Sequence, residues 1–151
     1  QMDWLIRALK CSSAPFKLVA IGSQVLNDAA VYENYATMPQ ERAELLRRIE
    51  EEGIHGVVFL TGDRHFTELS EVKLKDGRVL YDLTVSPLTS GVYKAKETNT
   101  NRVDGTIVEQ RNFATLSFSG TLKERVMLIR VFDAKGTLLW ERTIPRSTKT
   151  K

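Results

Sequence analysis

The sequence has few residues of some types and lacks several patterns, and each scarcity or absence limits the structures or partners that the chain can have. It contains one cysteine, Cys11, so no disulfide can form within the chain, and the redox compartment stays open. No apolar run approaches the roughly 18–20 residues that a transmembrane helix needs. No basic patch is interleaved with aromatic residues, so we expect no nucleic-acid partner. Only two histidines are present, which limits the imidazole ligands that the chain can offer a metal ion.

The rest of the composition is that of a single globular domain spanning residues 1–151. The chain is 42% hydrophobic and 27% charged, with a formal net charge of +3. A chain of this length can bury roughly 68–70% of its unfolded surface, which is enough for one core. Gln1 opens in the middle of an amphipathic helical pattern. We therefore expect the natural protein to begin upstream of it.

The first half predicts a strand–helix–strand unit after a helix over residues 2–10. FKLVAIG (16–22) predicts a buried strand, and GVVFLT (56–61) predicts a second. Between them, an apolar stripe at helical spacing predicts a helix over residues 39–52, which begins at a proline and ends at Gly53. This order predicts two parallel strands joined by a right-handed crossover. Neither strand alternates in polarity, so we expect helices or a second sheet to cover both faces.

Polar residues follow both predicted strands at the same edge of the sheet. The segment from Gly22 to Gln24 follows the first strand, and the segment from Gly62 to His65 follows the second. The carboxyl ends of parallel strands meet at one edge, and ligands bind there in sheets of this kind. We therefore expect a site at this edge.

The second half predicts antiparallel structure. Residues 68–74 and 79–85 form a predicted hairpin, with Asp76–Gly77 as its turn. Three alternating segments within residues 113–144 predict an antiparallel meander. The intervening loop, residues 86–112, has no period, and loops of that length are usually functional or mobile.

Asp63 and His65 are the candidate metal ligands. A carboxylate and an imidazole two residues apart, on a turn after a strand, can both reach one metal cluster, and Gly62 leaves room for the turn. The alternative is that Asp63 caps the turn and that His65 makes one hydrogen bond. His55 stands at the opposite end of its strand, so the chain offers one ligand pair, and one pair does not complete a catalytic metal site.

Several motifs resemble the C-terminal part of the alkaline phosphatase D family, within the calcineurin-like metallophosphoesterases. The resemblance rests on FKLVAIGSQVLN, on ERAELLRRIEEEGIHGVVFLTGDRHFTEL, on YDLTVSPLTSG and on the closing LIRVFDAKGTLLWERTI. These segments occur in the family's order and extend over nearly the whole chain. In the wider superfamily the last motif is Gly-His-x-His, and here Asp63 replaces the first histidine, as it does in this family.

The resemblance implies a fold, a reaction and a set of ligands. The fold would be part of an α/β/β/α metallophosphoesterase sandwich, a βαβ unit followed by an antiparallel meander. Asp63 and His65 would bind metal ions, by resemblance iron and calcium, and the substrate would be a phosphate ester hydrolysed by metal-activated water. Arg64 and Gln24 would contact the substrate, although an ion pair for Arg64 and a loop cap for Gln24 are competing interpretations. Family members are often exported, which suggests a periplasmic or extracellular location.

The family's remaining ligands come from an N-terminal half that does not precede Gln1. We therefore expect the chain to be a C-terminal fragment that is inactive alone. A non-catalytic module, which uses the same scaffold to bind a partner or a second copy, is the alternative. A doubly wound nucleotide-binding domain is disfavoured, because no Gly-rich phosphate loop joins the first strand and helix.

Overall fold

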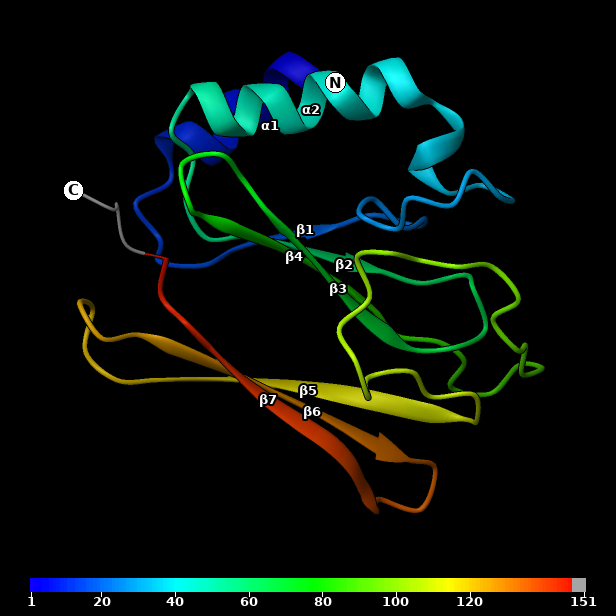
Figure 1. The fold of residues 1–151 in the computed structure, drawn as a ribbon. Coiled ribbons are helices and arrows are strands. Elements are labelled where there is room, and N and C mark those ends of the chain that lie inside the picture. Colours follow the sequence, from blue (N-terminus) through cyan, green and yellow to red (C-terminus); the bar gives the residue numbers. More distant parts are fainter. Residues whose placement is uncertain (148–151) are drawn as a thin grey trace.

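The computed structural model describes residues 1–147 and has three stacked layers (Figure 1). Two helices lie over one face of a four-stranded mixed sheet, and a three-stranded antiparallel sheet lies against the other face. The predicted α/β class is confirmed, as is the βαβ unit followed by a meander. The layers correspond to three of the four layers in the predicted sandwich.

Both helices form where the sequence is amphipathic. α1 (Met2–Cys11) and α2 (Pro39–Glu51) turn their apolar stripes toward the sheet. α2 begins at a proline, whose fixed φ suits the first turn and whose missing N–H is not needed there. It ends before Gly53, which adopts the left-handed conformation at φ +64°. The buried helical residues are Ile6, Leu9, Leu45 and Ile49.

The mixed sheet has the strand order β1-β2-β4-β3. β1, β2 and β4 run parallel, and β3 pairs antiparallel with β4 across the predicted hairpin. Consequently the carboxyl ends of three strands and the start of β3 meet at one edge. The strands are β1 (Lys17–Ala20), β2 (Val57–Thr61), β3 (Glu68–Lys73) and β4 (Val79–Thr84).

The prediction that β1 is buried on both faces is wrong. Its residues alternate between half-buried and exposed, and Leu18 is 44% exposed. β1 pairs only with β2, so within residues 1–147 its outer edge has no backbone partner. β2 is buried as predicted, because Val57 and Phe59 pack against the helices on one face and Val58 packs against the second sheet on the other.

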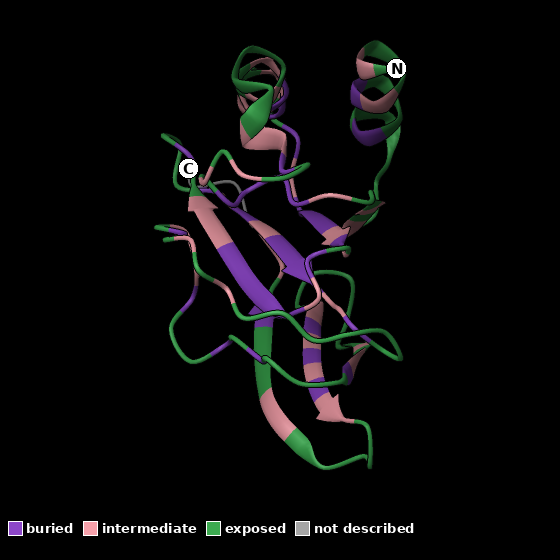
Figure 2. Cartoon of the chain, turned by 90° about the vertical axis from the view of Figure 1, so that its right-hand side faces the viewer, coloured by how far each residue is buried: buried purple, intermediate pink, exposed green. Residues whose placement is uncertain are grey.

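The meander forms the second sheet, in the order β5-β6-β7. The inward residues of its central strand, Met127, Ile129 and Val131, pack against Val58 and Leu83 of the mixed sheet. Figure 2 shows buried residues concentrated in the strands between the helices and this lower sheet. Its strands are β5 (Asn112–Ser119), β6 (Val126–Asp133) and β7 (Leu138–Pro145).

Two long connections lie at the carboxyl edge of the mixed sheet. The loop after β1, residues 21–34, and the loop before β5, residues 85–111, both emerge at this end of the molecule (Figure 1). Residues 99–108 of the second loop also cover the free side of β3, where Val103 N donates to Leu69 O at 2.8 Å. No helix within residues 1–147 has the length and apolar character needed to cross a bilayer.

Candidate metal centre

The turn after β2 carries the predicted ligand pair in a strained backbone conformation. Arg64 N donates to Gly62 O at 2.8 Å, which closes a three-residue turn around Asp63. Asp63 has φ +65° and His65 has φ +57°, a region that side chains with a Cβ rarely adopt. Such residues cost roughly 1–3 kcal/mol each, and they persist where the surrounding structure dictates them. This turn is therefore held in place by its neighbours.

Three backbone contacts anchor the turn to other segments. Gly62 N donates to Gly22 O at 3.1 Å, which confirms that the two predicted polar segments share one edge. His65 N donates to Ser86 Oγ at 3.0 Å, and Tyr93 N donates to His65 O at 2.9 Å. Contacts from both long loops thus fix the backbone on which the candidate ligands stand.

The side chain of Arg64 points from the same turn into the interior of the protein. This side chain is 6% exposed and makes an ion pair with Glu97 at 2.5 Å. One guanidinium nitrogen also donates to Gln24 Oε1 at 2.9 Å and to Asn34 Oδ1 at 2.8 Å. The guanidinium therefore links the turn to both loops, as the competing ion-pair interpretation had it, and its donors are largely used within the protein. Binding of substrate phosphate by Arg64 remains a prediction.

Gln24 lies beneath Arg64 and outside the pocket. It is fully buried, and its amide nitrogen donates to Glu68 Oε1 at 2.7 Å and to Thr84 Oγ1 at 2.8 Å. Its carbonyl oxygen accepts from Arg64 and from Asn27 Nδ2. With both ends of the amide occupied inside the protein, Gln24 supports the site from below, and its expected contact with substrate is not supported.

Two buried carboxylates complete this polar layer. Glu68 is fully buried, accepts from Asn99 Nδ2 at 2.9 Å and forms an ion pair with Arg102. Asp82 accepts from the backbone N–H groups of Val25 and Leu26 at 2.7 and 2.8 Å. Burial raises the pKa of Asp82 to about 6, although these hydrogen bonds oppose the shift. Both carboxylates hold loop segments against the end of the sheet.

The side chains of Asp63 and His65 remain available for a ligand. Asp63 is exposed, and its carboxylate makes no hydrogen bond or ion pair within residues 1–147. The Nδ1 atom of His65 is buried and has no hydrogen-bond partner among the described residues. A carboxylate oxygen and an imidazole nitrogen without partners fit the donors that iron, zinc, manganese or calcium accept. In the described part of the chain, no third His, Cys, Asp or Glu joins them to form a metal-binding group.

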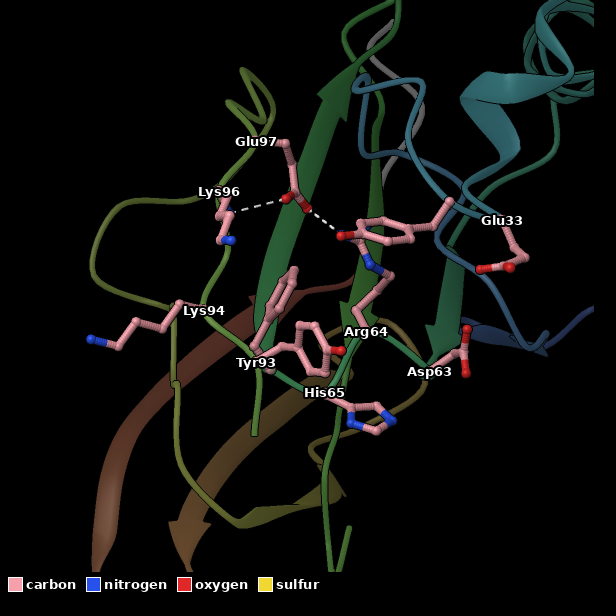
Figure 3. A pocket seen from close by; sticks show the side chains of 10 residues that line it. Glu33, Asp63, Arg64, His65, Tyr93, Lys94, Lys96 and Glu97 are labelled. Atoms are coloured by element: carbon pink, nitrogen blue, oxygen red, sulfur yellow. Dashed lines mark hydrogen bonds and ion pairs between the residues drawn. The ribbon is translucent and has the colours of Figure 1, made fainter. Parts of the chain in front are cut away.

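A pocket of about 260 Å³ opens beside the pair (Figure 3). Figure 3 shows Asp63 and Glu33 on one side and Lys94 and Lys96 on the other. The walls combine residues of the turn with residues of both long loops, so the pocket exists only where these segments meet. Its lining residues are Tyr32, Glu33, Asp63, Arg64, His65, Phe66, Tyr93, Lys94, Lys96 and Glu97.

Comparison with known proteins identifies the family. Residues 1–127 match the family model described as PhoD-like phosphatase. The chain belongs to the PhoD-like phosphatase family. This finding confirms the resemblance to alkaline phosphatase D that the sequence motifs indicate. A search of curated proteins found no match.

A solved structure described as "Structure of PhoD" shares the fold of this PhoD-like chain. The two are 15% identical with a TM-score of 0.66, and the match covers 97% of this chain and 35% of that one. The chain therefore spans about a third of the length of the solved protein. At this identity the likeness concerns the fold, and it assigns no role to individual residues.

Sequence reasoning missed most of the residues that surround the ligand pair. Tyr93 and Glu97 lie in the loop without a period, and no pattern there indicates which side chains turn inward. Glu68 follows directly on the GDRHFT segment at the start of a strand. From the sequence alone, a glutamate at that position is as compatible with an exposed side chain as with a buried one. Its burial depends on Arg102, which lies 34 residues away in sequence.

Proposed function

We propose that this PhoD-like chain is part of a metal-dependent hydrolase of phosphate esters. The observation that supports the proposal is the pair of Asp63 and His65, which line one pocket and leave a carboxylate and an imidazole nitrogen without partners. Their backbone is strained and anchored from both loops, as is common for residues at functional sites. The family supports phosphoric ester hydrolysis as the reaction.

Asp63 and His65 would hold the metal, and the remaining residues would shape its surroundings. When bound, a metal ion polarises the phosphoryl oxygens and lowers the pKa of the attacking water. Asp63 contributes an anionic oxygen, which suits calcium or iron, and His65 contributes a nitrogen, which suits iron. Arg64 keeps both residues in position through Glu97, Gln24 and Asn34. Iron and calcium therefore remain the metals that we propose.

Two ligands do not complete such a site, so we propose that another segment supplies the others. The outer edge of β1 is a suitable place for that segment to join, because its backbone is unpaired within residues 1–147. The carboxyl end of β1 lies near Gly62, since Gly22, two residues after β1, accepts a hydrogen bond from Gly62 N. A strand added beside β1 would thus end close to Asp63. In this proposal the chain alone is inactive, and the complete enzyme is exported.

A second candidate function is association without catalysis, and an apolar groove favours it. The groove lies between α1 and β1 and includes Trp4, Phe16 and Leu18, of which Trp4 is 69% exposed. Exposed apolar surface beside an unpaired strand edge promotes contact with another chain. Sedimentation velocity separates the cases, since Leu18→Lys should reduce self-association, with Leu138→Lys on the second sheet as the control, because Leu138 is similarly exposed, at 46%. Wild type that stays monomeric at high concentration would contradict self-association.

The native gene product tests the proposed function directly. We expect an intact mass well above 17.1 kDa and hydrolysis of a phosphate ester that a chelator abolishes. Asp63→Asn and His65→Ala should lose this hydrolysis, whereas Asp104→Asn and His55→Ala should retain it as matched controls. A native mass near 17.1 kDa without hydrolysis would contradict the proposal. Robust metal-dependent turnover by the pure 151-residue chain would contradict the need for a second segment.

A further inference from the structure

The pocket beside Asp63 and His65 has features that metal binding does not require. Three of its ten lining residues are aromatic: Tyr32, Phe66 and Tyr93. Tyr32 and Tyr93 are 67% and 59% exposed, although both belong to well-anchored segments at the site. Exposed aromatic side chains that gather at a cavity are typical of surfaces that bind ligands.

The charges of the pocket balance, so the pocket has no net preference for an anion. Its lining contains three basic side chains and three acidic ones. The Arg64 guanidinium, which is the buried cation, is already paired with Glu97. Lys94 and Lys96 are exposed to solvent, and the Lys94 side chain extends away from the other labelled side chains (Figure 3). Without a metal, recognition at this place therefore depends on its aromatic walls more than on its charge.

Both tyrosines are fixed relative to the candidate ligands. The Arg64 guanidinium lies 4.9 Å from the centre of the Tyr32 ring, and this cation–π contact holds the ring over the turn. The Tyr93 ring meets His65 edge to face, with ring centres 5.5 Å apart and an interplanar angle of 86°. Tyr93 N also donates to His65 O, which secures the ring from its backbone. The rings are thus positioned before any ligand arrives.

From this arrangement we infer that the pocket is a subsite for an aromatic ring in the leaving group of the phosphate ester. The inference rests on the proposed function, because the ester's phosphoryl group would face Asp63 and His65. Tyr93 would contact the ring on the side next to His65, and Tyr32 would supply the opposing wall. Aromatic contacts add about 0.5–1.5 kcal/mol beyond the burial of area, which corresponds to a two- to tenfold preference for a planar ring.

A pair of esters that differ only in ring planarity tests the inference. Phenyl phosphate and cyclohexyl phosphate present six-membered apolar rings of similar size, and only the first is aromatic. Their binding to the 151-residue chain is measured by nuclear magnetic resonance titration of backbone amides in the presence of calcium, which is diamagnetic and offsets the negative charge of Asp63. We expect phenyl phosphate to bind about two- to tenfold more tightly, with shifts centred on residues 32, 65 and 93.

Substitutions of Tyr32 and Tyr93 test whether their rings cause the preference for phenyl phosphate over cyclohexyl phosphate. Tyr32→Leu and Tyr93→Leu each keep an apolar side chain and should reduce the preference toward unity, whereas Tyr32→Phe and Tyr93→Phe should retain it. Trp4→Leu, the same kind of change on α1, should leave it unaltered. Equal binding of the two esters, a preference that survives both leucine variants, or no saturable shift at the pocket would overturn the inference.

A separate titration keeps failure of this inference distinct from failure of the proposed function. Metal binding at Asp63 and His65 is followed with the metal alone, without any ester. Absence of metal binding, together with an intact preference for phenyl phosphate, would refute the metal site and leave the aromatic subsite. Metal binding without a preference for phenyl phosphate would refute the aromatic subsite and leave the metal site.

Discussion

Replacing Arg64 with methionine should be among the most damaging changes at the site. The substitution keeps most of the side-chain length but removes the cation from a pair in which Arg64 and Glu97 are 6% and 9% exposed. It would leave the Glu97 carboxylate buried without its partner, and it would remove the donor to Gln24 and Asn34. Breaking a buried ion pair from one side costs about 3–5 kcal/mol, a large share of a typical domain's 5–15 kcal/mol.

Urea unfolding measures this loss, and thermal unfolding should show a decrease in Tm of roughly 6–20 °C. Glu97→Met, which leaves the guanidinium without its anion, should also destabilise the chain. The double variant should lose less unfolding free energy than the two single variants lose in sum, because it removes both charges together and leaves neither one buried without its partner. The exposed pair of Arg130 and Glu141 is the control, and Arg130→Met should cost at most about 1 kcal/mol. A loss below 1 kcal/mol for Arg64→Met, or strict additivity, would refute the view that Arg64 joins the loops.

Two further predictions concern the interior that supports the site. Because the folded pKa of Asp82 is raised to about 6 from 3.8, its contribution to stability is present below pH 4 and is lost as pH rises through 6. In the wild type, the free energy of unfolding measured with urea should therefore fall by about 3 kcal/mol between pH 4 and pH 6, and in Asp82→Asn this fall should be absent. The same pH dependence in both proteins would contradict the assignment to Asp82. Gly56→Ala should cost several kcal/mol, because its Cβ would lie 2.0 Å from Pro15 O, whereas Gly53→Ala, with open space around it, should cost about 1–2 kcal/mol. Equal losses at the two glycines, compared by thermal unfolding, would argue against this packing.

The sequence predicts the elements of the fold well because each has a local cause. α2 has a proline at its start and a glycine after its end, and the hairpin has Asp76–Gly77 at its turn. The parallel pairing of β1 with β2 follows from the helix between them. The sequence does not predict the exposure of β1, because an apolar run does not reveal whether another strand or layer lies beside it.

The candidate site was predicted only in part. Asp63 and His65 are recognisable because they follow a buried strand at the edge where ligands bind, and the structure places both at a pocket. The surroundings of the pair arise from long-range contacts, such as Arg64 with Glu97, 33 residues apart, and Gln24 with Glu68, 44 residues apart. No local pattern encodes such pairs, which explains why the sequence alone leaves two interpretations open for Gln24, a contact with substrate and a role in holding the loop.

The position of a bound metal ion tests the central claim most directly. A manganese(II) titration of the ¹⁵N-labelled chain would broaden the amide signals nearest to the ion, and it requires no activity. We expect broadening to begin at residues 62–66 and at the neighbouring Ser86 and Tyr93, and to disappear in Asp63→Asn and His65→Ala but not in His55→Ala. Broadening centred elsewhere, or unchanged in the Asp63 and His65 variants, would contradict the assignment of these two residues as metal ligands.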